Sequence, residues 1–398
     1  MTLSQVEISK WIEAHIAEDS TKLLFKYGNN PQLRYAIMQI ECRHKAAKKI
    51  PDFIANPDFR FPTLLSAEQC TSQSLARFHT SLIPSHSRVL DLTCGLGIDT
   101  FSLARKAKCV TSCELDAEIA RTAIENAIAL GLDNVEIITG DSSLICESIE
   151  EKSYDVIFVD PDRRGSGGHR LYALNDCHPD ITQIQPRLLR IADTLIIKAS
   201  PMLDITNTVS KLSDVKEIIS LGTESECKEL IIICNKGFVG EPRLRAVSLV
   251  RNSEESSFNF LGSEEKACEG TYGSPIVGDI LYEPYPATMK IAPFCLLCRN
   301  FGTSAISRDS HLYFKSGEVE TGFPGRKYEI KQIHRFDKKG IKEIMLRNTG
   351  LDISTRNFPL SAPQLASRLK IKTGSNRDIL FATTSERGEK LMILAHRI

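Results

Sequence analysis

Four acidic residues stand at or near the ends of four short apolar runs in the middle of the chain. The runs are residues 88–92, 109–115, 135–140 and 154–160, and the acids are Asp91, Glu114, Asp141 and Asp160. The length and apolar content of each run are typical of a buried strand, and helical stretches lie between the runs. Strands connected through helices pair in parallel, and such sheets bind ligands at the carboxyl ends of their strands. The four acids are therefore expected to line one binding site.

A glycine-containing turn follows the first run, in VLDLTCGLGIDTFSLA. Gly95 and Gly97 allow the backbone to turn tightly and to approach a ligand closely. A dinucleotide-binding loop has a third glycine and holds a pyrophosphate at the start of the next helix. Here the third glycine position is Thr100, and the carboxylates of Asp91 and Asp99 would face the phosphates. Those carboxylates suit the ammonium and sulfonium of S-adenosylmethionine better, so the loop favours this cofactor over NAD.

Glu114 and Asp141 each allow two interpretations. Glu114 could accept hydrogen bonds from both ribose hydroxyls of a cofactor, or it could be a solvated strand end. Asp141 could accept from an adenine amino group, or it could cap the helix expected over DSSLICESI. Because all these acids follow consecutive strands, we expect the ligand-binding interpretation to hold for the group.

The fourth acid opens the stretch Asp160-Pro161-Asp162-Arg163-Arg164. An acid or amide followed by proline at this strand end is typical of enzymes that methylate base nitrogens, where an aromatic side chain usually stacks on the base. No aromatic residue follows here. The arginines could stack on a base or clamp a phosphate, or they could pair with nearby carboxylates. We expect Asp160 to orient the methyl acceptor and take its proton, with Pro161 and Arg163 as its catalytic neighbours.

Three further side chains are weaker candidates near this strand end. Tyr172 could fold back across the glycine-rich GSGGHR segment and supply the missing aromatic ring, whereas His169 is interpreted as an ordinary loop histidine. Lys198, near the end of the run 194–200, could bind a phosphate or support the site near Asp160.

The cysteines argue against two other chemistries. Methylation at pyrimidine C5 of the type that uses a nucleophilic cysteine would place it just after the fourth strand, where none follows Pro161; Cys177 is a weak outside candidate. Cys295 and Cys298 have the spacing of half a zinc site, but no second pair accompanies them, so they are interpreted as buried thiols. No metal is expected.

Seven strand-like runs alternate with helical stretches between residues 87 and 236. The last three are 194–200, 217–221 and 229–234. This alternation predicts an α/β fold, a doubly wound Rossmann-like domain with a seven-stranded sheet and helices on both faces. Helical periodicity over residues 1–60 predicts a helical segment before it, and short strands with two basic helices after residue 326 predict a small α+β module.

Composition and charge set broad limits. The chain has 398 residues, 42% apolar and 25% charged, and twelve cysteines without a recognisable signal peptide or an apolar run long enough to span a membrane. These features predict a cytoplasmic protein with reduced thiols and no membrane partner. The net charge is zero, yet residues 299–398 carry 19 Lys and Arg against 10 Asp and Glu. Such a basic end suggests a partner with phosphates, or else a basic surface with no ligand.

Several passages resemble bacterial class I S-adenosylmethionine-dependent methyltransferases that carry a C-terminal THUMP-like domain. They are EQCTSQSLARFH (68–79), VDPDRRG, LNDCHPDI, LIIKASPMLDI, LYEPYPATMK (281–290) and FPGRKYEI, followed by RNFPLSAPQLASRLKIK and RDILFATT. The resemblance implies a small ferredoxin-like segment before the THUMP-like domain. It also implies that Gln69, Thr71 and Ser72 belong to a segment that covers the cofactor. In this family the residue after Asp-Pro is commonly small, and Asp162 departs from that pattern.

The expected domains are residues 1–75 (N-terminal helical domain), 76–240 (methyltransferase domain), 241–325 (linker and ferredoxin-like segment) and 326–398 (THUMP-like domain). The residues expected to bind the cofactor are Gln69, Ser72, Asp91, Thr93, Cys94, Gly95, Gly97, Asp99, Glu114, Asp141 and Asp160.

The resemblance implies an RNA methyltransferase, because THUMP domains are associated with RNA-modifying enzymes. Together with the Asp160-Pro161 strand end, this predicts methylation of a base nitrogen in tRNA or rRNA. Candidates for phosphate contact are Arg326, Lys327, Lys331, Arg335, Lys338, Lys339 and Arg347. Two alternatives remain open: a non-catalytic RNA-binding protein on a methyltransferase scaffold, and a small-molecule methyltransferase whose basic module serves dimerisation. An NAD oxidoreductase is disfavoured by Asp91 and Asp99.

Overall fold

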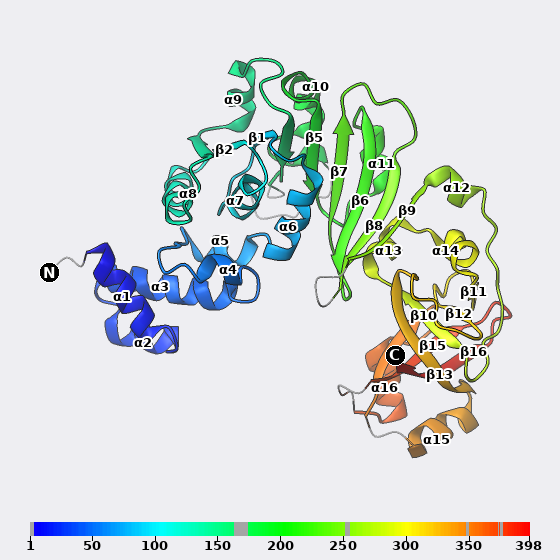
Figure 1. The fold of residues 1–398 in the computed structure, drawn as a ribbon. Helices are drawn as coiled ribbons and strands as arrows, with labels where there is room; N and C mark the ends of the chain where they lie inside the picture. Colours follow the sequence, from blue (N-terminus) through cyan, green and yellow to red (C-terminus); the bar gives the residue numbers. More distant parts are fainter. Residues whose placement is uncertain (1–3, 163–173, 251–254, 348–349, 373, 375–376) are drawn as a thin grey trace. The chain divides into compact units, whose positions relative to one another are not determined.

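The computed structural model describes residues 4–162, 174–250, 255–347, 350–372, 374 and 377–398. The chain divides into two compact units, residues 1–215 with 232–239, and residues 216–231 with 240–398 (Figure 1).

The first unit begins with six helices. They are α1 (Gln5–His15), α2 (Ser20–Tyr27), α3 (Pro31–Ala46), α4 (Pro51–Ile54), α5 (Leu64–Gln69) and α6 (Gln73–Leu82). Local sequence sets their starts: Ser4 and Glu7 form a capping box on α1, and Asn30 caps α3, which opens with Pro31. The helical segment expected over residues 1–60 is therefore confirmed.

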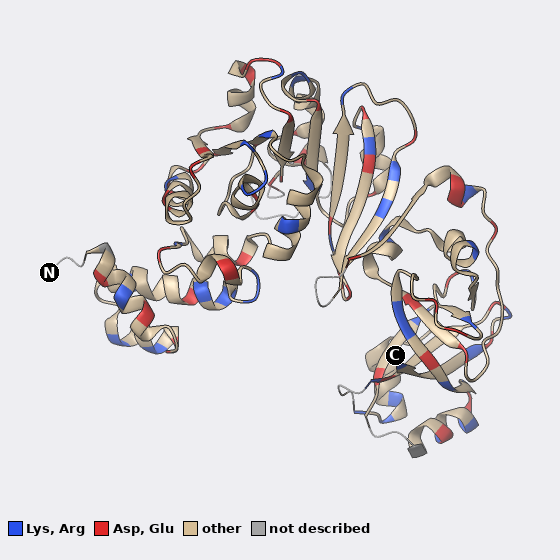
Figure 2. Ribbon diagram, viewed as in Figure 1, with Lys and Arg blue, Asp and Glu red and all other residues tan. Residues whose placement is uncertain are grey.

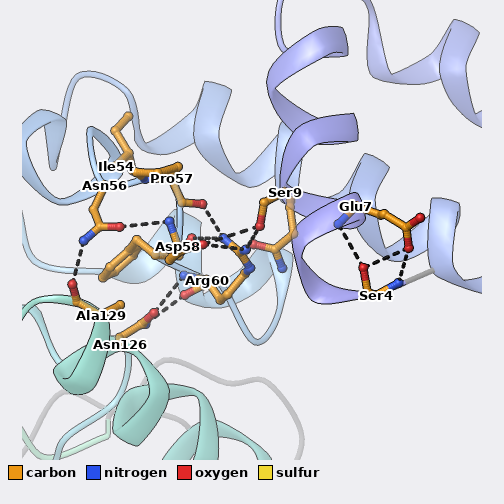
Figure 3. Close-up of polar contacts among 12 residues, drawn as sticks. Ser4, Glu7, Ser9, Ile54, Asn56, Pro57, Asp58, Arg60, Asn126 and Ala129 are labelled. Carbon is orange, nitrogen blue, oxygen red and sulfur yellow. Dashed lines mark hydrogen bonds and ion pairs between the residues drawn. The ribbon is translucent and has the colours of Figure 1, made fainter.

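This helical segment is bound tightly to helix α8 (Ala117–Ala129) (Figure 3). The backbone N–H of buried Arg60 donates to Asn126 Oδ1 at 2.7 Å, and Asn126 Nδ2 donates back to the Arg60 carbonyl at 2.9 Å. Asn56 Nδ2 donates to the carbonyl of Ala129 at 2.8 Å. Apolar side chains from residues 42–76 share one core with residues 94–101 and α8. The helices before residue 75 thus pack directly onto the expected methyltransferase domain.

A parallel sheet follows. Its elements are β1 (Arg88–Asp91), α7 (Ile98–Ala104), β2 (Cys109–Glu114), α8, β3 (Val135–Thr139), α9 (Ser142–Ser148), β4 (Val156–Val159), η1 (Leu174–Asp176), α10 (Ile181–Ile191), β5 (Thr194–Ala199) and α11 (Ile205–Ser210). β1 pairs in parallel with both β2 and β4, β2 with β3, and β4 with β5. This arrangement brings the carboxyl ends of β1 to β5 to one edge, as the sequence predicted.

The sheet is larger than expected. β6 (Val215–Thr223) and β7 (Cys227–Asn235) complete the seven predicted strands, and β8 (Arg243–Leu249) and β9 (Glu255–Leu261) extend the order to β3-β2-β1-β4-β5-β7-β6-β8-β9. The prediction missed β8 and β9 because charged residues such as Arg243, Arg245 and Glu255 interrupt their apolar residues. The Rossmann-like α/β class is confirmed, with nine strands in place of seven.

A second sheet has seven strands in the order β11-β12-β10-β13-β16-β15-β14. Its elements are α12 (Gly262–Lys266), β10 (Ile280–Pro284), α13 (Pro286–Ile291), α14 (Phe294–Phe301), β11 (Ser304–Ala305), β12 (Tyr313–Lys315), β13 (Gly325–Arg335), α15 (Lys338–Arg347), β14 (Asp352–Arg356), α16 (Ala362–Leu369), β15 (Asp378–Thr384) and β16 (Lys390–Arg397). β10 and β13 pair in antiparallel fashion, so the expected ferredoxin-like segment and THUMP-like domain share this sheet. None of the described helices is both long and apolar enough to cross a membrane.

Candidate cofactor and acceptor site

The turn between β1 and α7 depends on two glycines with positive φ. Gly95 has φ +56° and Gly97 has φ +89°, values that other residues rarely adopt. A Cβ added to Gly97 would lie 2.3 Å from the ring of Phe101, whereas a Cβ added to Gly95 would have no atom within 4 Å. Gly97 is therefore required by packing, and Gly95 borders open space.

Asp91 lies inside the protein beneath this turn. Its side chain is fully buried and accepts from the backbone N–H of Thr93 (3.0 Å) and from the hydroxyls of Thr100 (2.5 Å) and Ser112 (2.9 Å). Burial raises the pKa of Asp91 to about 6, although these donors oppose the rise. The carboxylate thus holds the turn to the sheet, and its oxygens already have protein donors.

Glu114 ends β2 and also supports the turn. Its Oε2 accepts from the backbone N–H of Gly95 at 2.8 Å, and its Oε1 accepts from that of Asp116 at 3.0 Å. The carboxylate is half-buried. Because each oxygen of a carboxylate can accept more than one hydrogen bond, Glu114 can also accept from a ligand hydroxyl.

Asp141 has the capping role that the sequence allowed. Its Oδ1 accepts from the N–H of Ser143 at 2.9 Å at the start of α9, and it lies 3.7 Å from His178 Nε2. The carboxylate remains partly exposed at the end of β3. Capping and ligand contact are therefore compatible for this residue.

Asp160 and Pro161 follow β4 directly. The backbone N–H of Asp160 donates to Thr93 Oγ1 at 2.8 Å, which ties the end of β4 to the glycine turn. Pro161 is buried, and Asp162 exchanges two backbone hydrogen bonds with His178 (2.8 and 3.1 Å). Asp160, a third exposed, is thus held beside the turn by its backbone on both sides.

A lysine that sequence reasoning placed only loosely lies against Asp160. Lys198 Nζ on β5 donates to Asp160 Oδ2 at 2.7 Å and to Thr71 Oγ1 at 2.8 Å, and lies 3.7 Å from Asp99 Oδ2. Asp160 Oδ1 has no partner among the described residues. Oδ1 can therefore still accept a hydrogen bond from a ligand while Oδ2 is bonded to Lys198.

Asp99 is the centre of a second buried group. Its Oδ2 accepts from the hydroxyl of Thr71 at 2.6 Å, and its Oδ1 lies 2.7 Å from Nδ1 of His79, which is fully buried on α6. Burial alone would raise the pKa of Asp99, but the charges of His79 and Lys198 and the hydrogen bonds from His79 and Thr71 hold it well below its usual range. The signal that sequence reasoning missed was His79, which the helical spacing of α6 places on its buried face.

Three other expected residues lie around this group. Cys94 is buried in the turn, and burial raises the pKa of its thiol to about 12, so it is no nucleophile at neutral pH. Ser72 precedes α6 with its hydroxyl 3.1 Å from that of Ser74, and Gln69 is exposed at the end of α5. Arg163, His169 and Tyr172 lie outside the described residues, so their expected roles stay predictions.

The residues around the turn fit S-adenosylmethionine better than a dinucleotide. Four of the turn's backbone N–H groups are already bonded: those of Thr93 and Gly95 to Asp91 and Glu114, and those of Cys94 and Gly97 to the carbonyls of Cys113 and Cys94. They are therefore not available to hold a pyrophosphate. Partly exposed carboxylates and the open space at Gly95 suit a cationic ligand with hydroxyls. No cluster that could hold a metal ion exists in the part of the chain that the structure describes.

Comparison with known proteins supports the same architecture. A methyltransferase domain model matches residues 83–219, a ferredoxin-like domain model residues 281–324, and a THUMP domain-like model residues 325–397. The crystal structure of a candidate methyltransferase from Porphyromonas gingivalis is 28% identical, covers 100% of both chains and gives a TM-score of 0.88.

Curated relatives match shorter stretches. The chain is 44% identical over 81 residues to the 23S rRNA (uracil(1939)-C(5))-methyltransferase of Methylococcus capsulatus, and 31% identical over 138 residues to an uncharacterised RNA methyltransferase of Clostridium tetani. These matches cover 20% and 33% of this chain, and span only 18% and 30% of the relatives' lengths. The chain therefore carries a methyltransferase domain, a ferredoxin-like segment and a THUMP-like domain, in the order expected from its sequence.

Proposed function

We propose that this chain transfers a methyl group from S-adenosylmethionine to a base nitrogen in RNA, either tRNA or rRNA. The observation that carries the proposal is the position of Asp160 at the end of β4. Its backbone is bonded to Thr93 of the glycine turn, and its Oδ1 has no partner among the described residues. A carboxylate oxygen beside the cofactor turn can accept a hydrogen bond from the group to be methylated.

The residues of the chain contribute orientation and proton transfer. S-adenosylmethionine, when bound, supplies the methyl group for an in-line displacement. Asp160 Oδ1 orients the acceptor nitrogen and can take its proton. Glu114 and Asp141, which line the edge next to the turn, would hold the hydroxyls and amino group of the cofactor. Pro161 shapes the end of the strand, and Arg163 would position the substrate.

Methylation of a pyrimidine at C5 is a second candidate. The Methylococcus relative carries that activity in its name, and the structure brings Cys177 near the end of β4, because the next residue, His178, pairs with Asp162. Cys177 is half-buried. The base nitrogen remains the proposal because Asp160 itself, with its open oxygen, follows β4 directly.

The RNA partner is proposed from charge (Figure 2). Several of the expected basic residues are engaged by carboxylates: Arg326 by Glu283, Lys331 by Glu329, and Arg335 by Glu389. The structure offers a better group on the neighbouring helices α15 and α16 and in the residues that follow α16. These exposed residues are Lys338, Lys339, Lys342, Arg368, Lys370 and Lys372, here called the α15–α16 basic surface. The side chain of Arg347 lies outside what the structure describes. Phosphate contact by Lys327 stays a prediction, as does the cytoplasmic location of the protein.

Mass spectrometry of nucleosides tests the proposal and its alternatives together. RNA from cells with and without the gene is digested and compared. Loss of one N-methylated nucleoside in the deletion supports the proposal, whereas loss of 5-methyluridine favours C5 chemistry and directs attention to Cys177. Unchanged nucleosides, with purified protein that still binds RNA, would favour the non-catalytic binding protein. Failure to bind RNA at any salt concentration would favour a small-molecule substrate.

A further inference from the structure

Lys198 is a buried cation that the proposed reaction does not yet use. Only 7% of the residue is exposed, and its ammonium lies near groups from three other segments, those of Thr71, Asp99 and Asp160. It donates to Asp160 Oδ2 at 2.7 Å and to Thr71 Oγ1 at 2.8 Å. A buried ammonium is costly unless it is paired and hydrogen-bonded, so its position is set by these partners.

The partners of Lys198 are themselves fixed. The hydroxyl of Thr71 accepts a hydrogen bond from Lys198 and donates its single proton to Asp99 Oδ2 at 2.6 Å. Both partners together fix the orientation of this hydroxyl. Asp99 lies at the start of α7, and its other oxygen contacts buried His79 on α6 at 2.7 Å. The order His79, Asp99, Thr71, Lys198, Asp160 forms a continuous polar chain, which we call the Lys198 chain.

We propose that Lys198 is a positioning residue for methyl transfer. It holds Asp160 through Oδ2, so that Oδ1 alone faces the acceptor, and Thr71 and Asp99 hold Lys198 in turn. This inference deepens the proposed function and rests on it, because it takes Asp160 as the residue that contacts the acceptor.

Without Lys198 the Asp160 side chain would lose the hydrogen bond that holds its Oδ2 in place. The backbone of Asp160 would remain in place, because Thr93 binds its N–H and not its carboxylate. The carboxylate could then rotate, and the acceptor would spend less time in line with the methyl group. The expected signature is a fall in kcat with little change in cofactor binding, since the glycine turn is held by Asp91 and Glu114 and not by Lys198.

Four single variants separate positioning from simple structural support. Lys198→Met removes the ammonium and keeps much of the side-chain volume. Thr71→Val removes the linking hydroxyl, and Thr71→Ser restores it. Lys106→Met is the control, because Lys106 is half-buried in this unit and, among the described residues, donates only to the carbonyls of residues 80 and 81.

Three quantities are measured for each purified full-length variant: kcat for methyl transfer to total RNA, the dissociation constant for S-adenosylhomocysteine by calorimetry, and the melting temperature. We expect Lys198→Met to lower kcat about a hundredfold and Thr71→Val about tenfold, the range seen for misplaced catalytic groups. Thr71→Ser should recover most of the kcat lost in Thr71→Val. For Lys198→Met the dissociation constant should stay within about threefold of wild type, a difference below 1 kcal/mol. Lys106→Met should lower only the melting temperature.

A Lys198→Met variant with wild-type kcat would overturn the inference while leaving the proposed function intact. Equal losses in kcat and in S-adenosylhomocysteine binding would also overturn it, because they indicate a collapsed site. As a measurement independent of activity, the melting-temperature losses of Lys198→Met and Asp160→Asn should not add in the double variant. Additive losses would contradict the pairing. A wild type that binds S-adenosylhomocysteine but methylates no RNA would refute the proposed function, and the positioning role with it.

Discussion

The two glycines of the turn after β1 should respond differently to alanine. At Gly95 an added Cβ has no protein atom within 4 Å, so the cost to folding is the positive φ of +56° alone. A left-handed conformation costs a non-glycine residue roughly 1–2 kcal/mol, partly offset by a stiffer unfolded chain. We therefore expect Gly95→Ala to lower unfolding stability by about 1 kcal/mol, which corresponds to a fall in melting temperature of about 2–4 °C.

At Gly97 the added Cβ would lie 2.3 Å from the ring of Phe101, which is fully buried and cannot move aside. Overpacking of this kind costs about 1–3 kcal/mol in addition to the φ penalty, so Gly97→Ala should be destabilised by about 3 kcal/mol or more. The expected order of melting temperatures is wild type, Gly95→Ala, then Gly97→Ala.

Cofactor binding should follow a different order. The open space at Gly95 is where we expect S-adenosylmethionine to approach the backbone, so the methyl group of Gly95→Ala should collide with the ligand. Calorimetric titration with S-adenosylmethionine should show a loss of at least about tenfold in affinity, equivalent to 1.4 kcal/mol, in a folded protein. If Gly95→Ala bound S-adenosylmethionine as tightly as wild type, the turn would not be the cofactor site and the reasoning would be refuted.

Three further outcomes are expected. Burial raises the pKa of Asp91 from 3.8 to about 6. Between these pH values the folded state keeps a proton on Asp91 that the unfolded state has lost. The free energy of unfolding should therefore fall by about 3 kcal/mol as the pH rises from about 4 to 6. Denaturant titrations at several pH values should show this slope in wild type and a flatter one in Asp91→Asn; parallel curves would contradict it. Asn126→Ala leaves the buried N–H and C=O of residue 60 without partners, so the urea unfolding free energy should fall by roughly 2 kcal/mol or more, whereas exposed Glu125→Ala, the control, should change little. Reversal of charge at Lys338, Lys339 and Lys342 should weaken tRNA binding and flatten its salt dependence, as measured by filter binding at several salt concentrations. An unchanged slope of log affinity against log salt concentration would show that these lysines do not contact the phosphates of tRNA.

The fold could be read from sequence where apolar runs were continuous. All seven predicted strands of the first sheet were found, because several of them carry continuous apolar residues, such as VIFV in β4 and LII in β5. β8 and β9 were missed since polar and charged residues interrupt their buried ones, as the sequences RLRAVSL and ESSFNFL show. The packing of residues 42–76 against α8 was also not foreseen, because the two segments are far apart in the chain and the hydrogen bonds of Asn126 leave no periodic signal.

The site shows a similar division. Strand order and the glycine turn brought Asp91, Glu114, Asp141 and Asp160 to one edge, as the positions of their strands required. Sequence could not say which of these acids retains acceptor capacity, because that depends on neighbours such as Thr100 and Ser112, which occupy Asp91. Nor could it pair Lys198 with Thr71, since that contact spans 127 positions in the chain.

The central claim is that Asp160 holds an RNA acceptor for methyl transfer. The most direct measurement is transfer of tritium from methyl-labelled S-adenosylmethionine to RNA isolated from cells that lack the gene, with wild-type protein and with Asp160→Asn. The variant keeps the side-chain shape but removes the carboxylate that takes the acceptor's proton. We predict label in RNA with wild type and a rate at least about a hundredfold lower with Asp160→Asn, when both bind S-adenosylhomocysteine equally. Equal rates for the two proteins, or no label in RNA with wild type, would contradict the account.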